Sequence, residues 1–343
     1  MGCVGERALS TPCYEPAVSR PRVLVAEPDD LSERALAVLR VHADVELRAC
    51  GASELPDAFA RFDALWIKLG LRITADAMGP SPRCRFIAIP ATGTDHVDVA
   101  ACAARGITVL SLRGEGDRLR HVTATAEHTI ALVLLLVRHL PAALRSVERG
   151  EFDRNPFRGH ELQGMTAGLV GYGRLGRLVA KYLRAFDVRV LAYDPHARFD
   201  TDDVTRVDAL GRLLEESDIV SLHVVYDERT HGMIGAPELA RMRPGAVLVN
   251  TARGGVVDEV ALVEALRAGR IAGAAVDVVW GEPGPSPATS PLLAARHDLG
   301  DRLVITPHIG GNTWESLGKA EAIVAEKLVA ALSGTATAGK KID

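Results

Sequence analysis

A glycine-rich turn between an apolar run and a helical pattern constrains the fold of this chain more than any other feature. Residues 171–176 read G-x-G-x-x-G; they follow the apolar run Ala167–Val170 and open a segment whose apolar residues recur at helical spacing. The first glycine of such a turn permits a tight bend, the second lets the backbone approach a pyrophosphate, and the third lets helix and strand pack closely. The helix N-terminus offers unpaired N–H groups to phosphates. A plain strand-to-helix turn is the alternative, but the full context favours a dinucleotide site at Gly171, Gly173 and Gly176.

A carboxylate stands where such a site needs one. The next predicted strand, Val188–Tyr193, ends at Asp194, which is 18 residues after Gly176. A carboxylate about 20 residues past the last glycine accepts a hydrogen bond from the adenosine ribose 2′-hydroxyl and repels a 2′-phosphate. The position therefore favours NAD over NADP. The alternative role for Asp194 is to cap a helix.

Short apolar runs alternate with helical patterns along nearly the whole chain, which predicts an α/β fold with two doubly wound parallel sheets. A long helix is expected over residues 125–149, with Pro141 kinking or splitting it. A last helix is expected over residues 313–332, with Asn312 as N-cap and Glu315 completing a capping box. The remaining predicted strands are Val23–Ala26, Asp44–Leu47, Ala64–Lys68, Phe86–Pro90, Ile107–Leu110, Ile219–Val224, Ala246–Asn250, Ala274–Val278 and Leu303–Thr306.

Composition argues against several classes of protein. The 343 residues, 48% of them hydrophobic, suffice for about two domains. The net charge of −4 comes without a long basic stripe, so nucleic acid is not an expected partner. The longest apolar run, Ile130–Val137, is far shorter than the roughly 20 residues that span a bilayer. Residues 1–20 lack the apolar core of a secretory leader and are expected to form a flexible extension. Five scattered cysteines without a C-x-x-C pair predict reduced thiols in the cytoplasm and no metal site.

Three later segments follow predicted strands, at the edge where ligands of open α/β sheets bind. These segments hold Arg253, Glu282 and His308. Taken singly, each residue has an ordinary explanation: Arg253 as a surface cation, Glu282 as a solvated loop charge, and His308 as a satisfied histidine at a strand end. Their meaning depends on the sequence around them.

That sequence resembles the D-isomer-specific 2-hydroxyacid dehydrogenases, a family that includes phosphoglycerate dehydrogenase and glyoxylate/hydroxypyruvate reductases. The shared motifs are the glycine turn, NTARGGVVDE from Asn250, AAVDVVWGEP from Ala274 and TPHIGG from Thr306, in family order. Ala126–Thr129 (AEHT) and Ala91–Asp98 (ATGTDHVD) are also similar to the family. The resemblance runs from about residue 22 to residue 333.

The resemblance implies a fold and a reaction. The fold is a Rossmann cofactor domain, here residues 119–311, inserted into a discontinuous, flavodoxin-like substrate domain of residues 21–118 and 312–343. The reaction is reversible hydride transfer between NAD(H) and a small 2-oxo or 2-hydroxy acid, without a metal. Members usually form homodimers through the cofactor domain, and the apolar helix Thr125–Val137 is consistent with that.

The resemblance also implies roles for single residues. Arg253 holds the substrate carboxylate and polarises the 2-oxo group. His308 is the general acid in reduction and the base in oxidation, and Glu282 fixes its orientation. The substrate carboxylate also receives main-chain N–H groups from Ala91, Thr92 and Gly93. The other residues implied in cofactor binding are Arg174, Leu175, Thr251, Asp277, Gly310 and Gly311.

The stretch of residues 111–125 departs from the family, because it is longer and more charged than the usual turn. It is either a solvated linker or a source of cations, Arg113, Arg118 or Arg120, that recognise a second anionic group on the substrate. A phosphate, a phosphonate or a second carboxylate would fit. Lys68, at a predicted strand end, is a further candidate for substrate binding.

Three alternatives stay open at this point. An NAD(H)-sensing corepressor is the main one, because relatives of that kind keep the same catalytic set. A formate dehydrogenase is disfavoured, because those enzymes carry Gln at the position of Glu282. A phosphite dehydrogenase stays open, because those enzymes place a lysine in the substrate domain, where Lys68 stands.

Overall fold

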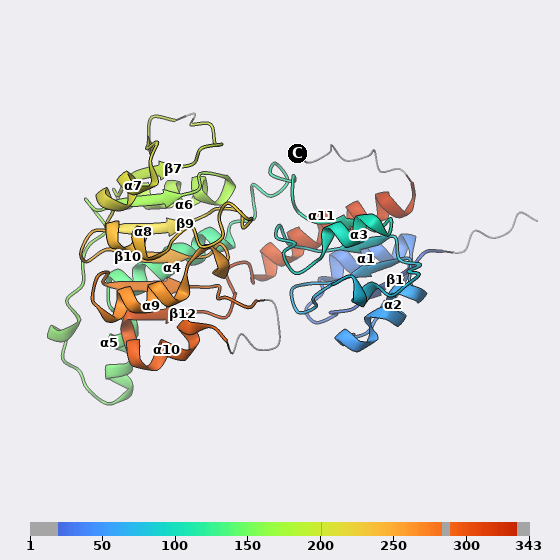
Figure 1. The fold of residues 1–343 in the computed structure, drawn as a ribbon, viewed down its shortest axis with the longest axis horizontal. Helices are drawn as coiled ribbons and strands as arrows, with labels where there is room; N and C mark the ends of the chain where they lie inside the picture. The colour runs from blue at the N-terminus through green and yellow to red at the C-terminus, as the bar shows by residue number, and fades with distance from the viewer. Residues whose placement is uncertain (1–19, 200, 283–288, 335–343) are drawn as a thin grey trace, which may run out of the picture.

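The computed structural model describes residues 20–199, 201–282 and 289–334. Its strands form two separate sheets, one in each of two lobes (Figure 1). The strands of both sheets pair in parallel. The first sheet has the order β2-β1-β3-β4-β5 and the second β12-β11-β10-β9-β6-β7-β8. These are the strand orders of flavodoxin-like and dinucleotide-binding doubly wound folds, so the predicted fold class is confirmed.

The first lobe combines the N-terminal elements with the last helix of the chain, which lies beside α1 (Figure 1). Its strands are β1 (Arg22–Val25), β2 (Asp44–Leu47), β3 (Ala64–Trp66), β4 (Phe86–Ala88) and β5 (Thr108–Leu110). Its helices are α1 (Glu33–His42), α2 (Leu55–Arg61), α3 (Val99–Ala104) and α11 (Trp314–Leu332).

The second lobe holds the rest. Its strands are β6 (Thr166–Val170), β7 (Arg189–Tyr193), β8 (Thr205–Arg206), β9 (Ile219–Leu222), β10 (Val247–Asn250), β11 (Gly273–Val276) and β12 (Leu303–Ile305). Its helices are α4 (Ala124–Val137), α5 (Leu140–Glu148), α6 (Arg174–Arg184), α7 (Leu210–Glu216), α8 (Ala236–Arg241), α9 (Glu259–Arg267) and α10 (Pro291–Leu299).

Helices cover both faces of each sheet, which explains why the central strands read as continuous apolar runs. In β1, Val23 and Val25 pack with α1 and α11, whereas Leu24 packs with α2 and α3. In β6, Leu169 faces the core shared with α4 and α6, and Val170 faces the core shared with α7 to α10. Each lobe therefore has three layers, and its loops at the carboxyl ends of the strands are free to form a site.

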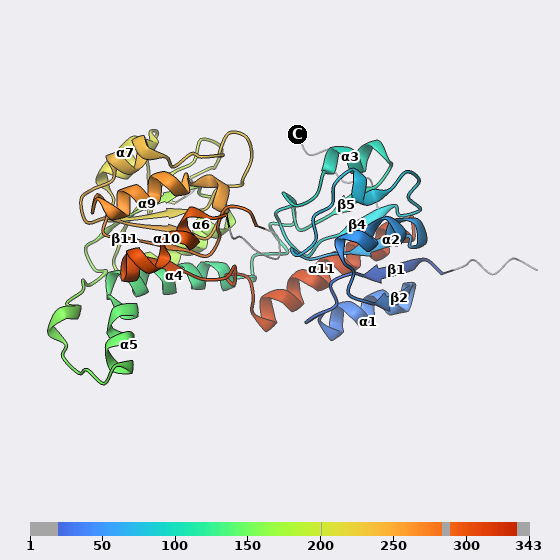
Figure 2. The same ribbon diagram turned by 60° about the horizontal axis from the view of Figure 1, so that its bottom comes forward.

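The predicted long helix is split, as Pro141 indicated. Helices α4 and α5 meet at a bend of 68°. His139 between them is left-handed, and Pro141 lies in the first turn of α5, where its missing N–H is tolerated. Helix α5 points away from the sheet (Figure 2). Across the described parts of the chain, no single helix is both long and apolar enough to cross a membrane; α4 and α5 pass that test only together, across their bend.

Two sequence predictions about α11 need correction, one strand was missed, and one prediction falls outside the described residues. Thr313, not Asn312, is the N-cap of α11 and accepts a hydrogen bond from Ser316 N at 3.2 Å. The predicted capping box is wrong for the same reason, because Glu315 is then two residues from the cap instead of three. Strand β8 was not predicted, because two exposed residues carry no apolar alternation. The predicted N-terminal extension lies outside the described residues, apart from Arg20.

Candidate active site

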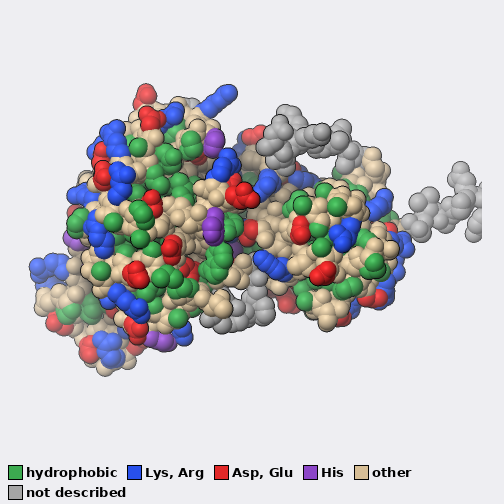
Figure 3. All heavy atoms as spheres, viewed as in Figure 1, with side chains coloured by type: hydrophobic (Ala, Val, Ile, Leu, Met, Phe, Trp, Pro, Cys, Tyr) green, Lys and Arg blue, Asp and Glu red, His purple; other side chains and the backbone are tan. Residues whose placement is uncertain are grey.

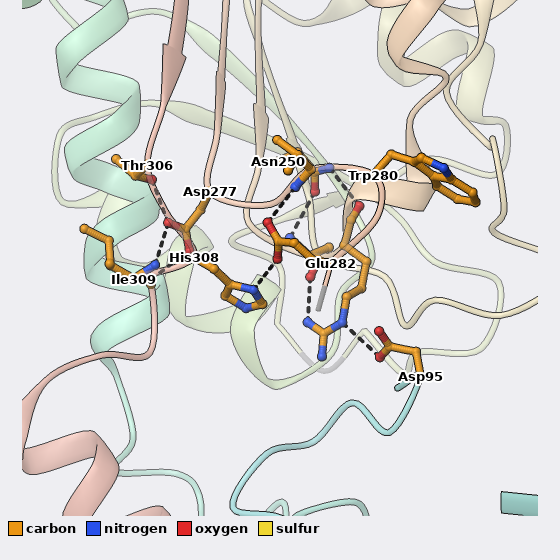
Figure 4. A network of polar contacts seen from close by, with 12 residues as sticks. Asp95, Asn250, Asp277, Trp280, Glu282, Thr306, His308 and Ile309 are labelled. Carbon is orange, nitrogen blue, oxygen red and sulfur yellow. Dashed lines mark hydrogen bonds and ion pairs between the residues drawn. The ribbon is translucent and has the colours of Figure 1, made fainter. Parts of the chain in front are cut away.

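The three motif segments that follow β10, β11 and β12 meet at one edge of the second sheet, opposite a loop of the first lobe. Figure 4 shows Glu282 and His308 in one polar network with Asp277, Asn250 and Asp95. The first four come from the second lobe and Asp95 comes from the loop after β4. The parallel arrangement explains the meeting, because the carboxyl ends of all these strands lie at the same edge.

His308 and Glu282 form the shortest contact of the network. His308 Nδ1 lies 2.5 Å from Glu282 Oε2, and the other carboxylate oxygen accepts from Val279 N at 3.0 Å. Because Nδ1 is bound to the carboxylate, Nε2 is the ring nitrogen available to another partner. The imidazole is 29% exposed, so that nitrogen can be reached from outside.

Asp277 fixes the backbone that carries His308. His308 has a φ of +54°, a conformation that side-chain-bearing residues rarely adopt. The carboxylate of Asp277 accepts from Thr306 Oγ1 at 2.6 Å, from Ile309 N at 2.9 Å and from Gly310 N at 2.7 Å. Three donors on both sides of His308 therefore converge on one buried carboxylate. This is how the fold holds the histidine loop in its strained shape.

Arg253 reaches from the end of β10 towards the first lobe. Its Nε donates to Asp95 Oδ1 at 3.1 Å and its Nη1 donates to Ala252 O at 2.8 Å. The Asn250 side chain bonds both Arg253 O and Ala252 N, at 2.9 and 3.0 Å, and so fixes the loop that carries the arginine. Asp95 was not among the predicted site residues, although it lies in the ATGTDHVD segment that follows β4.

The predicted substrate loop of residues 91–93 lies against this arginine. A Cβ on Gly93 would collide with Arg253 Nη2 and crowd Asp95 Oδ1, so a larger residue would displace these side chains. Ala91 is partly buried and its carbonyl accepts from Leu112 N at 3.0 Å, while Thr92 is exposed. The loop is therefore anchored at Ala91 and meets the second lobe at Gly93.

The glycine turn has the geometry of a phosphate cradle. Gly171 has a φ of +98°, and a Cβ there would lie 2.6 Å from His223 O. A Cβ on Gly176 would collide with Gly171 O, so the third glycine permits the close packing of α6. Gly173 is the N-cap of α6 and has open space where a Cβ would be, while Leu175 packs into the core of this lobe. The N-terminus of α6 therefore faces free space that a pyrophosphate could fill.

Asp194 and Thr251 lie on either side of this turn. The Asp194 carboxylate accepts from Tyr172 N at 2.8 Å, His196 N at 2.9 Å and Ala197 N at 3.0 Å. Thr251 is buried, with its hydroxyl 2.9 Å from that of Thr129. Asp194 is thus held at the end of β7, beside the glycine turn, where a ribose would lie.

His223 packs against the glycine turn in its neutral form. Burial lowers the pKa of His223 to about 4. Its Nε2 lies 2.9 Å from Ser221 Oγ, and its carbonyl is the group against which Gly171 packs. His223 is therefore uncharged at neutral pH and acts through packing and one hydrogen bond.

Several predicted cations have partners away from Arg253. Lys68 Nζ contacts Asp29 O and lies 3.6 Å from the buried carboxylate of Glu321 in α11. Arg118 pairs with Glu115 and Glu326, also towards α11. The structure thus uses both cations to attach α11 to the rest of the first lobe.

The side chains of Arg174 and Arg113 differ in whether they have a polar partner. Arg174 Nη1 donates to Leu119 O at 3.2 Å and to Val122 O at 2.6 Å, and burial lowers the pKa of its guanidinium. Its side chain therefore holds the segment that crosses between the lobes, while its backbone begins α6. Arg113 is exposed, and its side chain has no hydrogen bond or ion pair with any residue that the structure describes.

Charged side chains of both signs face the boundary between the lobes, and the visible surface carries no large patch of one sign (Figure 3). Among the described residues, the motif segments bring together one strongly polar cluster. It consists of Arg253, Glu282 and His308, with Asp277 supporting the loop that carries His308.

Comparison with known proteins identifies the family of this chain. Residues 130–310 match the family described as D-isomer specific 2-hydroxyacid dehydrogenase, NAD binding domain. The chain is 39% identical over 313 residues to a D-3-phosphoglycerate dehydrogenase of Archaeoglobus fulgidus; the match covers 90% of this chain and 56% of that protein. It is 36% identical over 329 residues to a glyoxylate reductase of Thermofilum pendens, covering 92% of this chain and 93% of that protein.

A solved structure extends the likeness to the whole fold. The crystal structure of D-lactate dehydrogenase from Aquifex aeolicus, complexed with NAD and lactic acid, superposes with a TM-score of 0.80 at 28% identity. The superposition covers 92% of this chain and 96% of that one. With both lobes, the glycine turn and the three motif segments accounted for, the chain belongs to the D-isomer specific 2-hydroxyacid dehydrogenase family.

Proposed function

We propose that this protein is an NAD-dependent D-2-hydroxyacid dehydrogenase that interconverts a small 2-oxo acid and its 2-hydroxy acid. The observation that carries the proposal is the pairing of His308 with Glu282 at 2.5 Å in the same network as Arg253, which faces the Gly93 loop. These groups supply what the reaction requires: a proton carrier, a partner that orients it, and a cation for a carboxylate.

Each residue has one task in this mechanism. Arg253 Nη2 and the backbone N–H groups of residues 92 and 93 hold the substrate carboxylate and set the direction of the 2-oxo group. His308 Nε2 donates a proton to the carbonyl oxygen during reduction and takes it back during oxidation. Glu282 accepts from Nδ1 and keeps the imidazole in the required tautomer. When bound, the nicotinamide supplies or accepts the hydride at C2 of the substrate.

The residues around the glycine turn fit a dinucleotide. Gly171, Gly173 and the first turn of α6 would hold the pyrophosphate, with the backbone of Arg174 and Leu175. Thr251, Asp277, Gly310 and Gly311 line the same edge further along the sheet. Asp194 would accept from the ribose 2′-hydroxyl, which makes NAD the proposed cofactor and NADP the poorer one. We expect kcat/KM for NADH to exceed that for NADPH, and Asp194→Ser to narrow the ratio. An unchanged ratio would remove Asp194 from this role.

The activity is tested by NADH oxidation, followed by absorbance, against a panel of 2-oxo acids. The panel holds glyoxylate, hydroxypyruvate, pyruvate, branched and aromatic 2-oxo acids, 3-phosphohydroxypyruvate and phosphonopyruvate. We expect turnover of at least one compound, and a fall of about 10²- to 10⁴-fold in kcat for His308→Gln, the usual contribution of a positioned proton donor. Tight NADH binding without turnover of any compound would instead support an NAD(H)-sensing regulatory protein.

The substrate carries a second anionic group in our proposal, and Arg113 is the cation that recognises it. Support comes from its exposed side chain in the stretch that crosses between the lobes; Lys68 and Arg118 are already paired, and Arg120, which is also exposed, is the other candidate cation. Arg113→Ala should raise KM for 3-phosphohydroxypyruvate at least tenfold and leave KM for glyoxylate nearly unchanged. Equal effects on both compounds would contradict the proposal.

We also propose that two copies associate through the second lobe. Helix α5 projects from that lobe (Figure 2) and exposes an apolar stripe of Leu140, Leu144 and Val147, followed by Phe152 at 97% exposure. Beside α5 lies a groove of about 800 Å³ whose apolar lining includes Leu136, Val137, Met165 and Val247. An exposed apolar stripe next to an apolar groove suits a self-complementary pair, in which each α5 covers the other copy.

Light scattering of the eluting protein tests this association. The mass should be twice that of the chain, and Leu144→Glu should reduce it to one copy. Val41→Glu, a matched change at an exposed position of α1 in the first lobe, should leave the mass unchanged. A monomeric wild type, or a dimeric Leu144→Glu variant, would contradict the proposed interface.

A reducing, cytoplasmic compartment completes the proposal. Its support is that Cys50, Cys84 and Cys102 are buried and unpaired, and burial raises the pKa of the Cys84 thiol to about 12. Cys3 and Cys13 lie outside the described residues.

A further inference from the structure

A carboxylate of the first lobe holds the substrate-facing arginine of the second. Asp95 Oδ1 accepts from Arg253 Nε at 3.1 Å, and the two side chains are 29% and 25% exposed. Arg253 Nη1 is engaged as well, because it donates to Ala252 O at 2.8 Å. Two of the three guanidinium nitrogens are therefore fixed. The third, Nη2, is the nitrogen that lies against Gly93.

We propose that Asp95 is a positioning residue, which sets the plane of the Arg253 guanidinium so that Nη2 faces the Gly93 loop where the substrate carboxylate binds. This inference rests on the proposed dehydrogenase function. An arginine side chain has many rotamers, and its planar fork recognises a carboxylate only in one orientation. Bonds to Nε and Nη1 together leave the guanidinium no free rotation.

The contact between Asp95 and Arg253 also depends on the distance between the two lobes. Asp95 follows β4 and Arg253 follows β10, so the bond forms only when the two lobes are close. Asp95 lies two residues after Gly93 on the same loop, so one movement delivers both the backbone N–H groups of the loop and the group that orients the arginine. Orientation of Arg253 is thereby coupled to closure of the site.

The charge state of Asp95 agrees with this role. Burial alone would raise the pKa of its carboxyl group, but the charge of Arg253 and the hydrogen bond from it outweigh burial and hold the pKa below its usual value. The Asp95 carboxyl group is therefore ionised at neutral pH. The same negative charge opposes an incoming substrate carboxylate, so the orienting effect and the charge effect of Asp95 act in opposite directions.

Substitution separates the two effects. Asp95→Asn keeps an oxygen that accepts from Nε and loses the charge, so we expect kcat within about threefold of wild type and KM for the 2-oxo acid unchanged or lower. Asp95→Ala loses the acceptor, so kcat/KM for the 2-oxo acid should fall about 10- to 100-fold. The Kd for NADH should stay within twofold in both variants. Asp98→Ala is the matched control, because Asp98 lies on the same loop and caps α3 through Ala101 N; kcat/KM should stay within twofold.

A double-mutant cycle decides whether Asp95 acts through Arg253. Methionine has neither a charge nor an N–H donor on its side chain, so Asp95→Ala should have less than a threefold effect when added to Arg253→Met. A multiplied loss in the double variant would overturn the inference, as would wild-type kcat/KM in Asp95→Ala.

A second readout needs no turnover and keeps this inference distinct from the proposed function. In protein labelled with ¹⁵N-arginine, Arg253 should give an Nε–H signal that exchanges slowly with water. The signal should persist in Asp95→Asn and disappear in Asp95→Ala. Its persistence in Asp95→Ala would show that Asp95 does not hold Arg253, whether or not any 2-oxo acid is reduced. Failure of the whole 2-oxo acid panel would instead count against the dehydrogenase.

Discussion

At the scale of single residues, the site depends on one buried carboxylate that accepts more hydrogen bonds than any side chain around it. Asp277 gathers Thr306 Oγ1, Ile309 N and Gly310 N, and His128 Nε2 lies 3.3 Å away. Thr306 Oγ1, Ile309 N and Gly310 N all donate, to both carboxylate oxygens, so an acceptor is required on each oxygen. The left-handed conformation of the histidine loop persists because these bonds over-determine it.

Asp277→Asn should therefore affect stability and catalysis together. The amide group would place a donor against one of the backbone N–H groups, which leaves a buried donor unsatisfied and lowers the free energy of unfolding by about 1–3 kcal/mol. The loosened loop should also lower kcat about tenfold or more. Urea unfolding and steady-state kinetics measure the two effects. A variant with wild-type stability and kcat would contradict this account of Asp277.

His223 gives the protein a pH-dependent stability with a defined sign. Burial lowers its pKa in the folded protein from 6.5 to about 4. Between these pH values the unfolded chain binds a proton that the folded chain excludes. The contribution of His223 to the free energy of unfolding is therefore fully present above pH 6.5 and is lost as the pH drops towards 4. His96, buried with a lowered pKa, acts in the same direction.

Urea unfolding at pH 7, 6 and 5 tests this linkage. His223→Asn should reduce the slope of unfolding free energy against pH by up to about 1.4 kcal/mol per pH unit, the value for one proton. The part contributed by His96 should remain. An identical slope in wild type and variant would mean that His223 does not titrate differently in the two states.

At the scale of elements, α11 belongs to the first lobe although the whole second lobe precedes it in sequence. Its residues Ala320 to Leu328 share a core with Val23 and Trp66. Polar contacts reinforce the attachment: Glu321 Oε2 accepts from Ser32 N at 2.7 Å, and Lys68 supplies a cation beside the buried carboxylate. The position of Lys68 is therefore explained by α11 without a substrate.

Lys68→Met should destabilise this attachment. Glu321 is 0% exposed, so removal of its cation leaves a buried charge uncompensated and lowers the free energy of unfolding by about 3 kcal/mol. Glu321→Gln, added to Lys68→Met, should recover part of that loss, because the amide oxygen still accepts from Ser32 N. A stable Lys68→Met variant with a tenfold higher KM for 3-phosphohydroxypyruvate would show instead that Lys68 serves the substrate.

At the scale of elements, the sequence predicts the strands but not the contacts between distant elements. Strand ends were predicted within a few residues because continuous apolar runs are local signals, and the strand ends bring Arg253, Glu282 and His308 to one edge. The partners of Lys68, Arg118 and Arg174 could not be predicted. Each depends on which face of a distant element packs nearby: Lys68 and Glu321, for example, are joined only once α11 has crossed back to the first lobe. Asp95 was missed for the same reason, since its role exists only across two lobes.

At the scale of the whole molecule, the proposed site is complete only when the two lobes (Figure 2) are close, because the Gly93 loop lies on the first lobe and Arg253, Glu282 and His308 lie on the second. The segment before α4 is held on both sides of this boundary: Lys319 in α11 donates to His121 O at 2.8 Å, and Arg174 in the second lobe donates to Val122 O. The segment that crosses between the lobes is thus restrained from both sides. Few positions remain where the chain can bend when the lobes move.

Gly93→Ala tests whether closure of these lobes is needed for substrate binding. The added methyl group meets Arg253 Nη2 only when the lobes are close, and it also approaches the rotatable side chain of Asp95 on the same loop, so the variant should still fold and keep the Kd for NADH. KM for the 2-oxo acid should rise at least tenfold, because the loop can no longer reach the arginine, and small-angle scattering should report a larger radius of gyration. Gly116→Ala is the matched control in the first-lobe segment that leads to the crossing, since a Cβ there meets nothing within 4 Å; it should change neither quantity. If Gly93→Ala kept the wild-type KM, the Gly93 loop would not be part of the substrate site, and the carboxylate would have to be held by Arg253 alone.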